Sequence, residues 1–256
     1  MSLDRIAFLL LLVQGIVAGA HAELAWPDLC ERLDVAGERQ PDEVRRYRML
    51  LNDRPAGQEV FRFWREEGDV RVLVDTRFDG DVLMFPADLR HCRDERWREE
   101  AGTLELVELE SATRYAVPFK PDYEIHIQRD PERGEVVYRG VSRFDSFEER
   151  HSANTGAITP WSVRTVAYDR LLDLFARGAY AIESSLVGRA AVGGRQVVHY
   201  AVDGEWPRHL WYEDGKMIRF CGEEPFTTYI DTILEDYADR EIDVLGLNRP
   251  CAAMFE

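Results

Sequence analysis

Alternating apolar and polar residues, interrupted by clusters of turn-forming residues, recur along most of this chain. In residues 70–78, Val, Thr or Phe occupies every second position, and charged residues fill most positions between them. This period of two is the pattern of a strand that is buried on one face. Residues 52–57 and 66–69 contain Gly, Pro, Asn and Asp, which favour turns. The pattern predicts an antiparallel β-meander.

The same rhythm predicts about ten antiparallel strands in a single domain over residues 44–240. Residues 23–43 are expected to form an irregular lead-in, residues 145–159 a mobile loop, and residues 241–256 a C-terminal tail. The final segment, 226–237, fits a strand or a helix, and we favour the strand. The other expected strands cover residues 44–51, 58–65, 70–78, 95–99, 104–110, 124–128, 135–139, 180–187, 196–202, 208–212 and 216–220.

One segment departs from the alternation. Residues 163–176 place apolar side chains at helical spacing, with Thr159-Pro160 as a start signal and Gly178 as a stop. A sheet of this size twists and curls, and its concave face is then either covered or left open. We therefore expect a mainly β fold, a curved antiparallel half-barrel with one amphipathic helix on the concave face.

The N-terminus predicts export. Residues 6–17 are almost continuously apolar, follow Arg5 and precede Ala20-His21-Ala22, whose small residues suit a signal peptidase. This run is shorter than the roughly 20 residues that cross a bilayer, so we disfavour the alternative of an uncleaved anchor. We expect residues 1–22 to be a signal peptide and the protein to be periplasmic or secreted.

The acidic composition of the chain excludes some classes of binding partner. The formal net charge is −16 at pH 7, which disfavours binding to nucleic acid and to anionic membrane surfaces. No further long apolar segment occurs, so an integral membrane protein is not expected. Nearly all the cations are arginines, which suits anion binding but also follows from a GC-rich genome, and we prefer the second explanation.

Four cysteines lie beyond the signal segment: Cys30, Cys92, Cys221 and Cys251. An even number in an exported chain indicates disulfides, and three connectivities are open. We favour Cys92 with Cys221 and Cys30 with Cys251, since the second pair would join two terminal segments. No two cysteines have the close spacing of a zinc site, so no metal is expected there.

Several short motifs resemble a known family. Residues 95–104 run from a charged strand with a Glu-x-Trp motif into a Gly turn, and the next strand ends at Ser111-Ala112-Thr113. Thr159-Pro160-Trp161 opens the expected helix, and residues 211–217 form a hairpin. Together these motifs resemble a family of bacterial periplasmic proteins known as a domain of unknown function. The resemblance covers residues 47–220.

This resemblance implies a curved half-barrel similar to the lipoprotein carriers LolA and LolB and to the pigment-pathway enzyme VioE. The family has no established catalytic residues, so the resemblance assigns none here. The cysteines and the acidic C-terminal segment depart from the family's pattern.

A polar cluster at His91, Asp94 and Glu95 offers candidate acid–base chemistry, which needs a histidine and a carboxylate in one pocket. His91 and Glu95 share one face of a strand, whereas Asp94 and Arg96 share the other. We favour a solvated, charge-paired sheet face over a functional pair. If the protein is an enzyme, His91, Glu95 and Arg96 are the catalytic candidates.

Two histidines, His199 and His209, fall on neighbouring expected strands and could meet across a hairpin. A third ligand such as Glu205 or Glu213 would complete a metal site, and His126 is a similar candidate. No metal-binding spacing supports such a site, so we expect no metal and no cofactor. The sequence also lacks a nucleophile elbow.

Aromatic residues are spread along the expected strands and helix. Most are expected to be core, but a subset that lined an incompletely filled concavity would bind an apolar ligand. The candidates for this ligand site are Trp97, Trp161, Phe175, Tyr200 and Trp211.

Three functional hypotheses follow. The first is a protein that binds or carries an apolar or lipid-like small molecule between the concave sheet and the helix at 163–176, without a cofactor. The second is an enzyme of the VioE kind that acts on a small apolar intermediate. The third is a scaffold in an envelope complex that uses exposed strand edges or the Arg-rich face. None of them fixes an oligomeric state.

Overall fold

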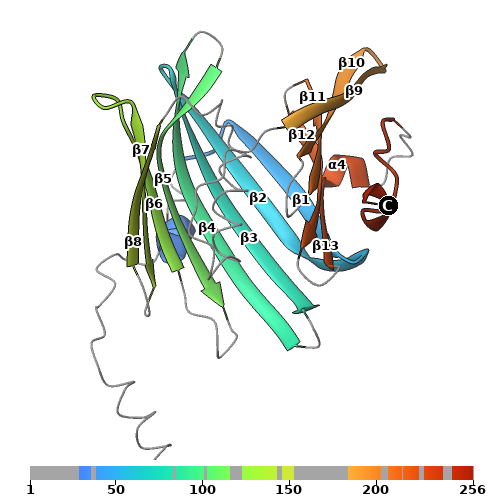
Figure 1. Cartoon of the computed structure of the whole chain (residues 1–256), viewed down its shortest axis with the longest axis horizontal. Helices are drawn as coiled ribbons and strands as arrows, with labels where there is room; N and C mark the ends of the chain where they lie inside the picture. The colour runs from blue at the N-terminus through green and yellow to red at the C-terminus, as the bar shows by residue number, and fades with distance from the viewer. Residues whose placement is uncertain are drawn as a thin grey trace, which may run out of the picture.

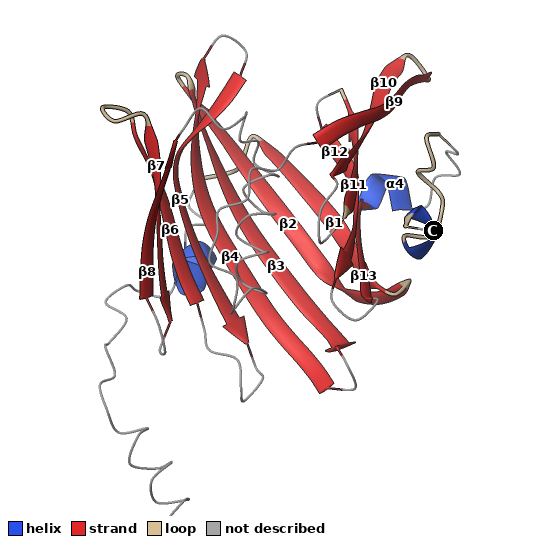
Figure 2. Cartoon of the chain, in the orientation of Figure 1, coloured by secondary structure: helices blue, strands red, loops and turns tan. Residues whose placement is uncertain are grey.

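A single antiparallel sheet dominates the protein (Figures 1 and 2). The computed structural model describes residues 29–35, 39–82, 85–100, 103–115, 123–142, 146–152, 184–202, 207–214, 216–224, 228–238 and 244–255. The sheet has 13 strands in the order β8-β7-β6-β5-β4-β3-β2-β1-β13-β12-β11-β10-β9. Strands β1 to β13 have the bounds Glu43–Leu51, Arg54–Glu66, Asp69–Val82, Phe85–Glu100, Thr103–Tyr115, Tyr123–Asp130, Glu135–Ser142, Ser146–Ser152, Ser184–Val192, Arg195–Val202, Arg208–Glu213, Lys216–Glu224 and Thr228–Leu234.

Two meanders make up this sheet, β1 to β8 and β9 to β13, and they join where β1 pairs with β13. At this seam Tyr47 lies opposite Leu234, and the Tyr47 hydroxyl donates a 3.0 Å hydrogen bond to the carbonyl of Met217 on β12. All neighbouring strands are antiparallel, so the edge strands β8 and β9, an even number of steps apart, run in the same direction. The two edges therefore cannot close through an antiparallel pair, and the sheet stays open.

Tight turns connect several of the hairpins. Asn52 and Asp53 have φ of 50° and 62°, and Gly193 and Gly194 have φ of 57° and 84°. Two such residues in a row form the type I′ turn that matches the twist of the flanking strands. The turn predicted at residues 52–57 is thus shorter than expected, and β2 already begins at Arg54.

The sheet is curved, with β5 to β8 on one side, β9 to β13 on the other, and β1 to β4 between them (Figure 1). We call the face that carries Tyr47, Phe61 and Trp97 the concave face. The opposite face, which carries Cys92 and Cys221, is the convex face. The strand registers place these residues on consistent sides across the whole sheet.

Both terminal segments pack on the convex face. Helix α2, Leu29–Val35, covers β3 to β5 through an apolar cluster that includes Leu29, Leu33, Leu73 and Trp64. The chain after β13 forms helix α4, Glu235–Ala238, and ends in a 3₁₀ turn, Ala252–Met254, outside β13 (Figure 1). Among the described residues, no helix has the length and apolar character needed to cross a membrane.

Disulfides fasten each of these segments: Cys30 bonds to Cys92 and Cys221 bonds to Cys251. The expected even pairing of four cysteines is confirmed, but the connectivity that we favoured is wrong. Cys92 on β4 and Cys221 on β12 are five strand spacings apart, which is about 24 Å along the sheet. A disulfide requires Cα atoms within about 7 Å, so each terminal cysteine bonds to the strand on which its own segment packs.

The mainly β, antiparallel fold is confirmed, with differences in detail. The sheet has 13 strands, more than expected, and β8 replaces part of the loop predicted at residues 145–159. Helix α2 lies within the lead-in that we expected to be irregular. The last segment is a strand, β13, followed directly by α4. The expected signal peptide at 1–22 and the helix at 163–176 lie outside the described residues.

Candidate functional site

Strands β2 to β5 bring polar side chains onto the middle of the concave face. Glu59, Thr76, His91 and Thr113 lie opposite one another in three consecutive strand pairs. All four residues are buried. Thr76 Oγ1 donates a 2.8 Å hydrogen bond to Oε1 of Glu59, and a 2.7 Å hydrogen bond joins Nδ1 of His91 to Oγ1 of Thr113. We call this set of four residues the polar row.

Arg93 and Glu95 follow His91 along β4 on the same face, and both are 0% exposed. Arg93 Nε lies 2.8 Å from Glu95 Oε1, but without the geometry of a hydrogen bond. Oε2 of Glu95 accepts a 2.9 Å hydrogen bond from the indole N–H of Trp97. The Glu95 carboxyl is therefore held between a guanidinium and an indole N–H.

Burial raises the pKa of Glu95 above its ordinary value. The positive charge of Arg93 and the hydrogen bond from Trp97 act in the opposite direction, but with less effect than burial. A guanidinium group keeps its positive charge in proteins. The site thus combines a fixed positive charge with a carboxyl group that takes up a proton more readily than an exposed one.

Apolar side chains surround these charged groups on the concave face. Phe61 and Phe63 stack with ring centroids 6.2 Å apart, and Phe61 meets Tyr47 edge-on at 5.3 Å. The Arg93 guanidinium carbon lies 5.9 Å from the centroid of the Phe61 ring. Further buried apolar residues on this face of β3, β5 and β6 are Val72, Val74, Leu109, Ile125 and Ile127.

The prediction that His91 and Glu95 share one face is confirmed, but the solvated setting that we favoured for them is wrong. Four residues along a strand span about 13 Å, so these two side chains start from well-separated points. Arg96 lies on the convex face, where it pairs with Glu108 at 3.3 Å. The three catalytic candidates therefore do not form one group.

A charge-paired, partly solvated surface does exist, but on the convex face. There the guanidinium of Arg71 donates two hydrogen bonds to Asp94, at 2.6 and 3.0 Å. Asp94 and Arg96 thus take the surface role that we had expected for the whole cluster, while the alternate residues of the same strand turn inward.

The aromatic candidates divide between the two faces. Trp97 is fully buried on the concave face, and Tyr200 lies on the same face of β10, edge-on to Tyr212 at 6.0 Å. Trp211 lies on the convex face and so cannot line the same surface as Trp97. Trp161 and Phe175 lie outside the described residues.

His199 and His209 do meet, as the sequence suggested: Nε2 of His199 lies 2.9 Å from Nδ1 of His209. The His199 ring also stacks on Trp211, with centroids 4.3 Å apart and an angle of 8° between the rings. Glu213 is engaged elsewhere, because it accepts a 2.9 Å hydrogen bond from Arg195. This pair is on the convex face, away from the polar row.

Metal binding gains no support from these histidines. Glu205 lies outside the described residues, and His126 bonds to Glu108 at 3.0 Å. No group of three or more His, Cys, Asp or Glu side chains able to hold a metal occurs in the part of the chain that the structure describes.

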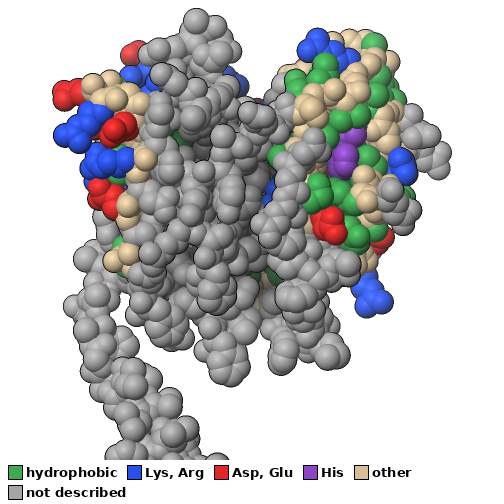
Figure 3. All heavy atoms as spheres, in the orientation of Figure 1, with side chains coloured by type: hydrophobic (Ala, Val, Ile, Leu, Met, Phe, Trp, Pro, Cys, Tyr) green, Lys and Arg blue, Asp and Glu red, His purple; other side chains and the backbone are tan. Residues whose placement is uncertain are grey.

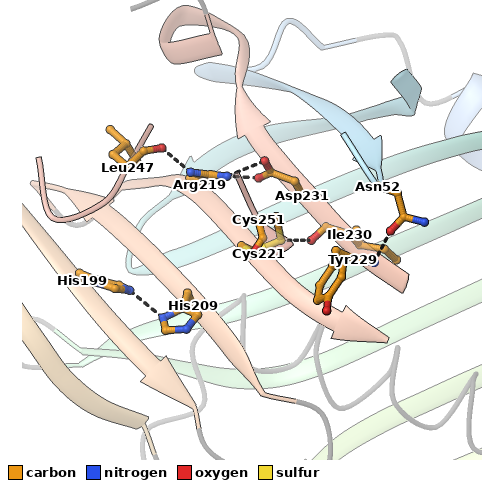
Figure 4. The surroundings of a disulfide bond; sticks show 10 residues. All are labelled: Asn52, His199, His209, Arg219, Cys221, Tyr229, Ile230, Asp231, Leu247 and Cys251. Atoms are coloured by element: carbon orange, nitrogen blue, oxygen red, sulfur yellow. Dashed lines mark hydrogen bonds and ion pairs between the residues drawn. A yellow bond between two sulfur atoms is a disulfide. The ribbon is translucent and has the colours of Figure 1, made fainter. Parts of the chain in front are cut away.

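The C-terminal segment, residues 244–255, contacts β11 and β12 near the histidine pair (Figure 4). Arg219 donates two hydrogen bonds to Asp231, at 2.7 and 2.9 Å, and a third to the carbonyl of Leu247. The Trp211 indole donates a 3.0 Å hydrogen bond to the carbonyl of Leu245. These contacts, together with the Cys221–Cys251 disulfide, indicate a structural role for this part of the convex face.

Sequence reasoning did not single out Glu59 and Arg93, although both are central to the concave site. Each carries a charge at a strand position that has a buried residue two positions along, Phe61 for Glu59 and Glu95 for Arg93. A charged residue that alternates in step with apolar positions of a strand can indicate a buried polar site, since charged residues are seldom buried without a partner. We had expected the face of the strand that carries Arg93 to be solvated, and we had assigned no role to Glu59.

Comparisons with protein-family models, with curated proteins and with solved structures give no match for this chain. The geometry of the concave face is therefore the basis for the functional argument.

Proposed function

We propose that this protein binds and carries an apolar or lipid-like small molecule on the concave face of β2 to β5. The observation that carries the proposal is the mixed character of that face, on which buried charged groups lie among aromatic and aliphatic side chains. Sites for small molecules have this composition, mostly apolar with a few converging polar groups.

The burial of charge also supports a binding role over a purely structural one. Removing an ion pair from water costs several kcal/mol per ion, and well-packed apolar residues are often as stable or more stable in its place. A core that served only the fold would therefore have little need of Arg93 and Glu95. A polar ligand group would offset part of the cost.

The location that we propose is the periplasm or the exterior. Two disulfides are consistent with an oxidising compartment, and the N-terminal sequence has the features of a signal peptide. The open, curved antiparallel sheet agrees in outline with the half-barrel, similar to that of LolA and LolB, that the family resemblance implies. Helix α2 and residues 244–255, the terminal parts of the chain that the structure describes, lie on the convex face, opposite the concave face of β2 to β5.

Native mass spectrometry tests this function directly. We expect the folded protein, offered palmitate and hexadecanol in turn, to retain at least one of them at unit stoichiometry. Replacing Leu109 on the concave face by Asp should abolish retention, whereas Arg96→Asp, on the convex face, should leave it unchanged. Failure of the protein to retain either molecule would refute the carrier proposal.

Catalysis of the VioE kind is the second candidate, because a buried carboxyl with a raised pKa keeps its proton to a higher pH than an exposed one and can act as a general acid. The same measurement separates it from carriage. A retained molecule that is recovered with unchanged mass after prolonged incubation supports a carrier. Conversion of that molecule by the native protein, lost in Glu95→Gln, supports an enzyme.

A further inference from the structure

Arg93 presents a buried guanidinium whose hydrogen-bonding capacity is unused within the described part of the chain. Its side chain is 0% exposed. None of its three guanidinium nitrogens, Nε, Nη1 and Nη2, has a hydrogen-bond partner among the described residues. A guanidinium has five N–H donors in a planar fork and does not lose its charge in proteins. Such a group is costly to bury unless something accepts from it.

Glu95 does not fill this role. Its Oε1 is close to Nε of Arg93 but is not aligned to accept a hydrogen bond, and its Oε2 accepts from Trp97. The outer edge of the guanidinium, formed by Nη1 and Nη2, is thus left for a further acceptor. This edge matches two coplanar oxygen atoms, which is the geometry of a carboxylate.

We infer that the ligand is a monocarboxylic acid with an apolar tail, and that the Nη1 and Nη2 atoms of Arg93 bind its carboxylate. This inference rests on the proposed carrier function and names the ligand class for the same site. Ser111 lies directly opposite Arg93 on β5. Its hydroxyl is a hydrogen-bond donor and would be a second donor for the carboxylate.

The neighbouring charges disfavour a dianionic ligand more strongly than a monoanionic one. Arg93 is the one cation among the charged side chains of the polar row and the Arg93–Glu95 pair, which also include the acids Glu59 and Glu95. A dianionic phosphate would bring more negative charge than this cation can compensate. A monoanionic carboxylate adds less negative charge beside these acids than a dianionic phosphate does, and the raised pKa of Glu95 reduces its competition for the guanidinium.

The residues around Arg93 accommodate an apolar tail. Phe61 lies beside the guanidinium, and Ile125 follows Ser111 across the next strand pair. Leu109 and Ile127 continue the apolar surface along β5 and β6 toward Trp97. A chain anchored at Arg93 would therefore extend over aliphatic and aromatic side chains.

A ligand series on the unaltered protein tests the inference without any substitution. Palmitate, hexadecanol and hexadecyl phosphate share one tail and differ in the head group, and their dissociation constants are measured by competition with one fluorescent acyl probe. We expect palmitate to bind about tenfold or more tightly than hexadecanol, the effect of a charge-assisted hydrogen bond, and more tightly than the phosphate. Equal binding of palmitate and hexadecanol, or tighter binding of the phosphate, would overturn the carboxylate assignment and leave the carrier function standing.

Variants then locate the head group. Arg93→Met should remove the preference for palmitate over hexadecanol while retaining hexadecanol binding, and Arg93→Lys should restore only part of it because it lacks the planar fork. Arg96→Met, on the same strand but the convex face, is the matched control and should keep the full preference. A preference that survives in a folded Arg93→Met variant would place the carboxylate elsewhere and refute the inference.

Discussion

His199 and His209 lie ring to ring on adjacent strands of the convex face, with Nε2 of one 2.9 Å from Nδ1 of the other. A hydrogen bond between two imidazoles needs at least one of them to be neutral, since in a doubly protonated pair both facing nitrogens are donors and neither can accept. Burial, the neighbouring His209 and the charge of Arg219 lower the pKa of His199 from its ordinary 6.5 to about 4.

This shift predicts a pH dependence of stability. Because the folded protein holds His199 neutral while the unfolded chain protonates it, the contribution is present above pH 6.5 and is lost as the pH falls towards 4. His199→Phe should flatten the profile of unfolding free energy over that window, by about 1–2 kcal/mol after allowance for partial solvent screening. Urea titrations of both proteins at several pH values measure this, and parallel profiles would contradict it.

Glu95 and Arg93 should behave as a coupled pair in stability measurements. Glu95→Leu alone leaves a buried guanidinium without compensation and is expected to cost about 3–5 kcal/mol of unfolding free energy. The double variant Arg93→Leu/Glu95→Leu should be much closer to the unaltered protein. Asp94→Leu, which removes a carboxylate paired on the partly solvated convex face, is the control and should cost about 1 kcal/mol or less. Additive losses in the double variant would argue against the pairing.

The disulfide Cys221–Cys251 should hold the C-terminal segment against β12. Replacing both cysteines by Ser is expected to lower the unfolding free energy by about 2–4 kcal/mol and to open residues 244–255 to proteolysis under native conditions. The corresponding Cys30→Ser/Cys92→Ser variant should lose a similar amount but keep the C-terminal segment protected. Mass mapping of non-reduced peptides checks the connectivity, and a Cys92–Cys221 peptide would refute it.

The edge strand β9 is expected to govern self-association. It exposes Leu186 and Val187, which are 49% and 54% exposed, whereas the other edge strand, β8, carries Glu148 and Arg150 (compare the two sides of Figure 3). Charged residues on an edge discourage pairing with another chain. Light scattering should show that Val187→Lys lowers association at high concentration.

Val44 provides the control for that measurement, because it is 42% exposed but lies on β1, an interior strand of the sheet, where it pairs with Arg62 of β2. Val44→Lys should leave association unchanged. An equal effect of both substitutions would point to general charge repulsion and away from the β9 edge.

Strands that are buried on one face could be predicted from the sequence, since the alternation over residues 70–78 corresponds directly to β3. Strand β8 was missed because an edge strand needs no apolar face: Glu148 instead pairs with Arg139 of β7 and with Arg150. Its sequence consequently resembles a polar loop. The helix α2 was missed for a related reason, since its seven residues are too few to show a helical period.

The concave site was predictable only in part. Parity along β4 places His91 and Glu95 on one face, as expected. Their burial depends on residues that other strands supply, and no local pattern reveals it. Arg93 shows the limit most clearly, because the absence of a described hydrogen-bond partner is a property of three-dimensional arrangement and not of its neighbours in sequence.

The seam between β1 and β13 sets the order in which this sheet can assemble. Within each meander, consecutive strands are close in the chain and can pair early, whereas joining Tyr47 to Leu234 closes a far longer loop. We therefore expect the two meanders to form first and to pair with each other late. Folding should consequently be slow for a chain of this size. The backbone amides of the β1–β13 pair would then be the last to gain protection from hydrogen exchange during folding.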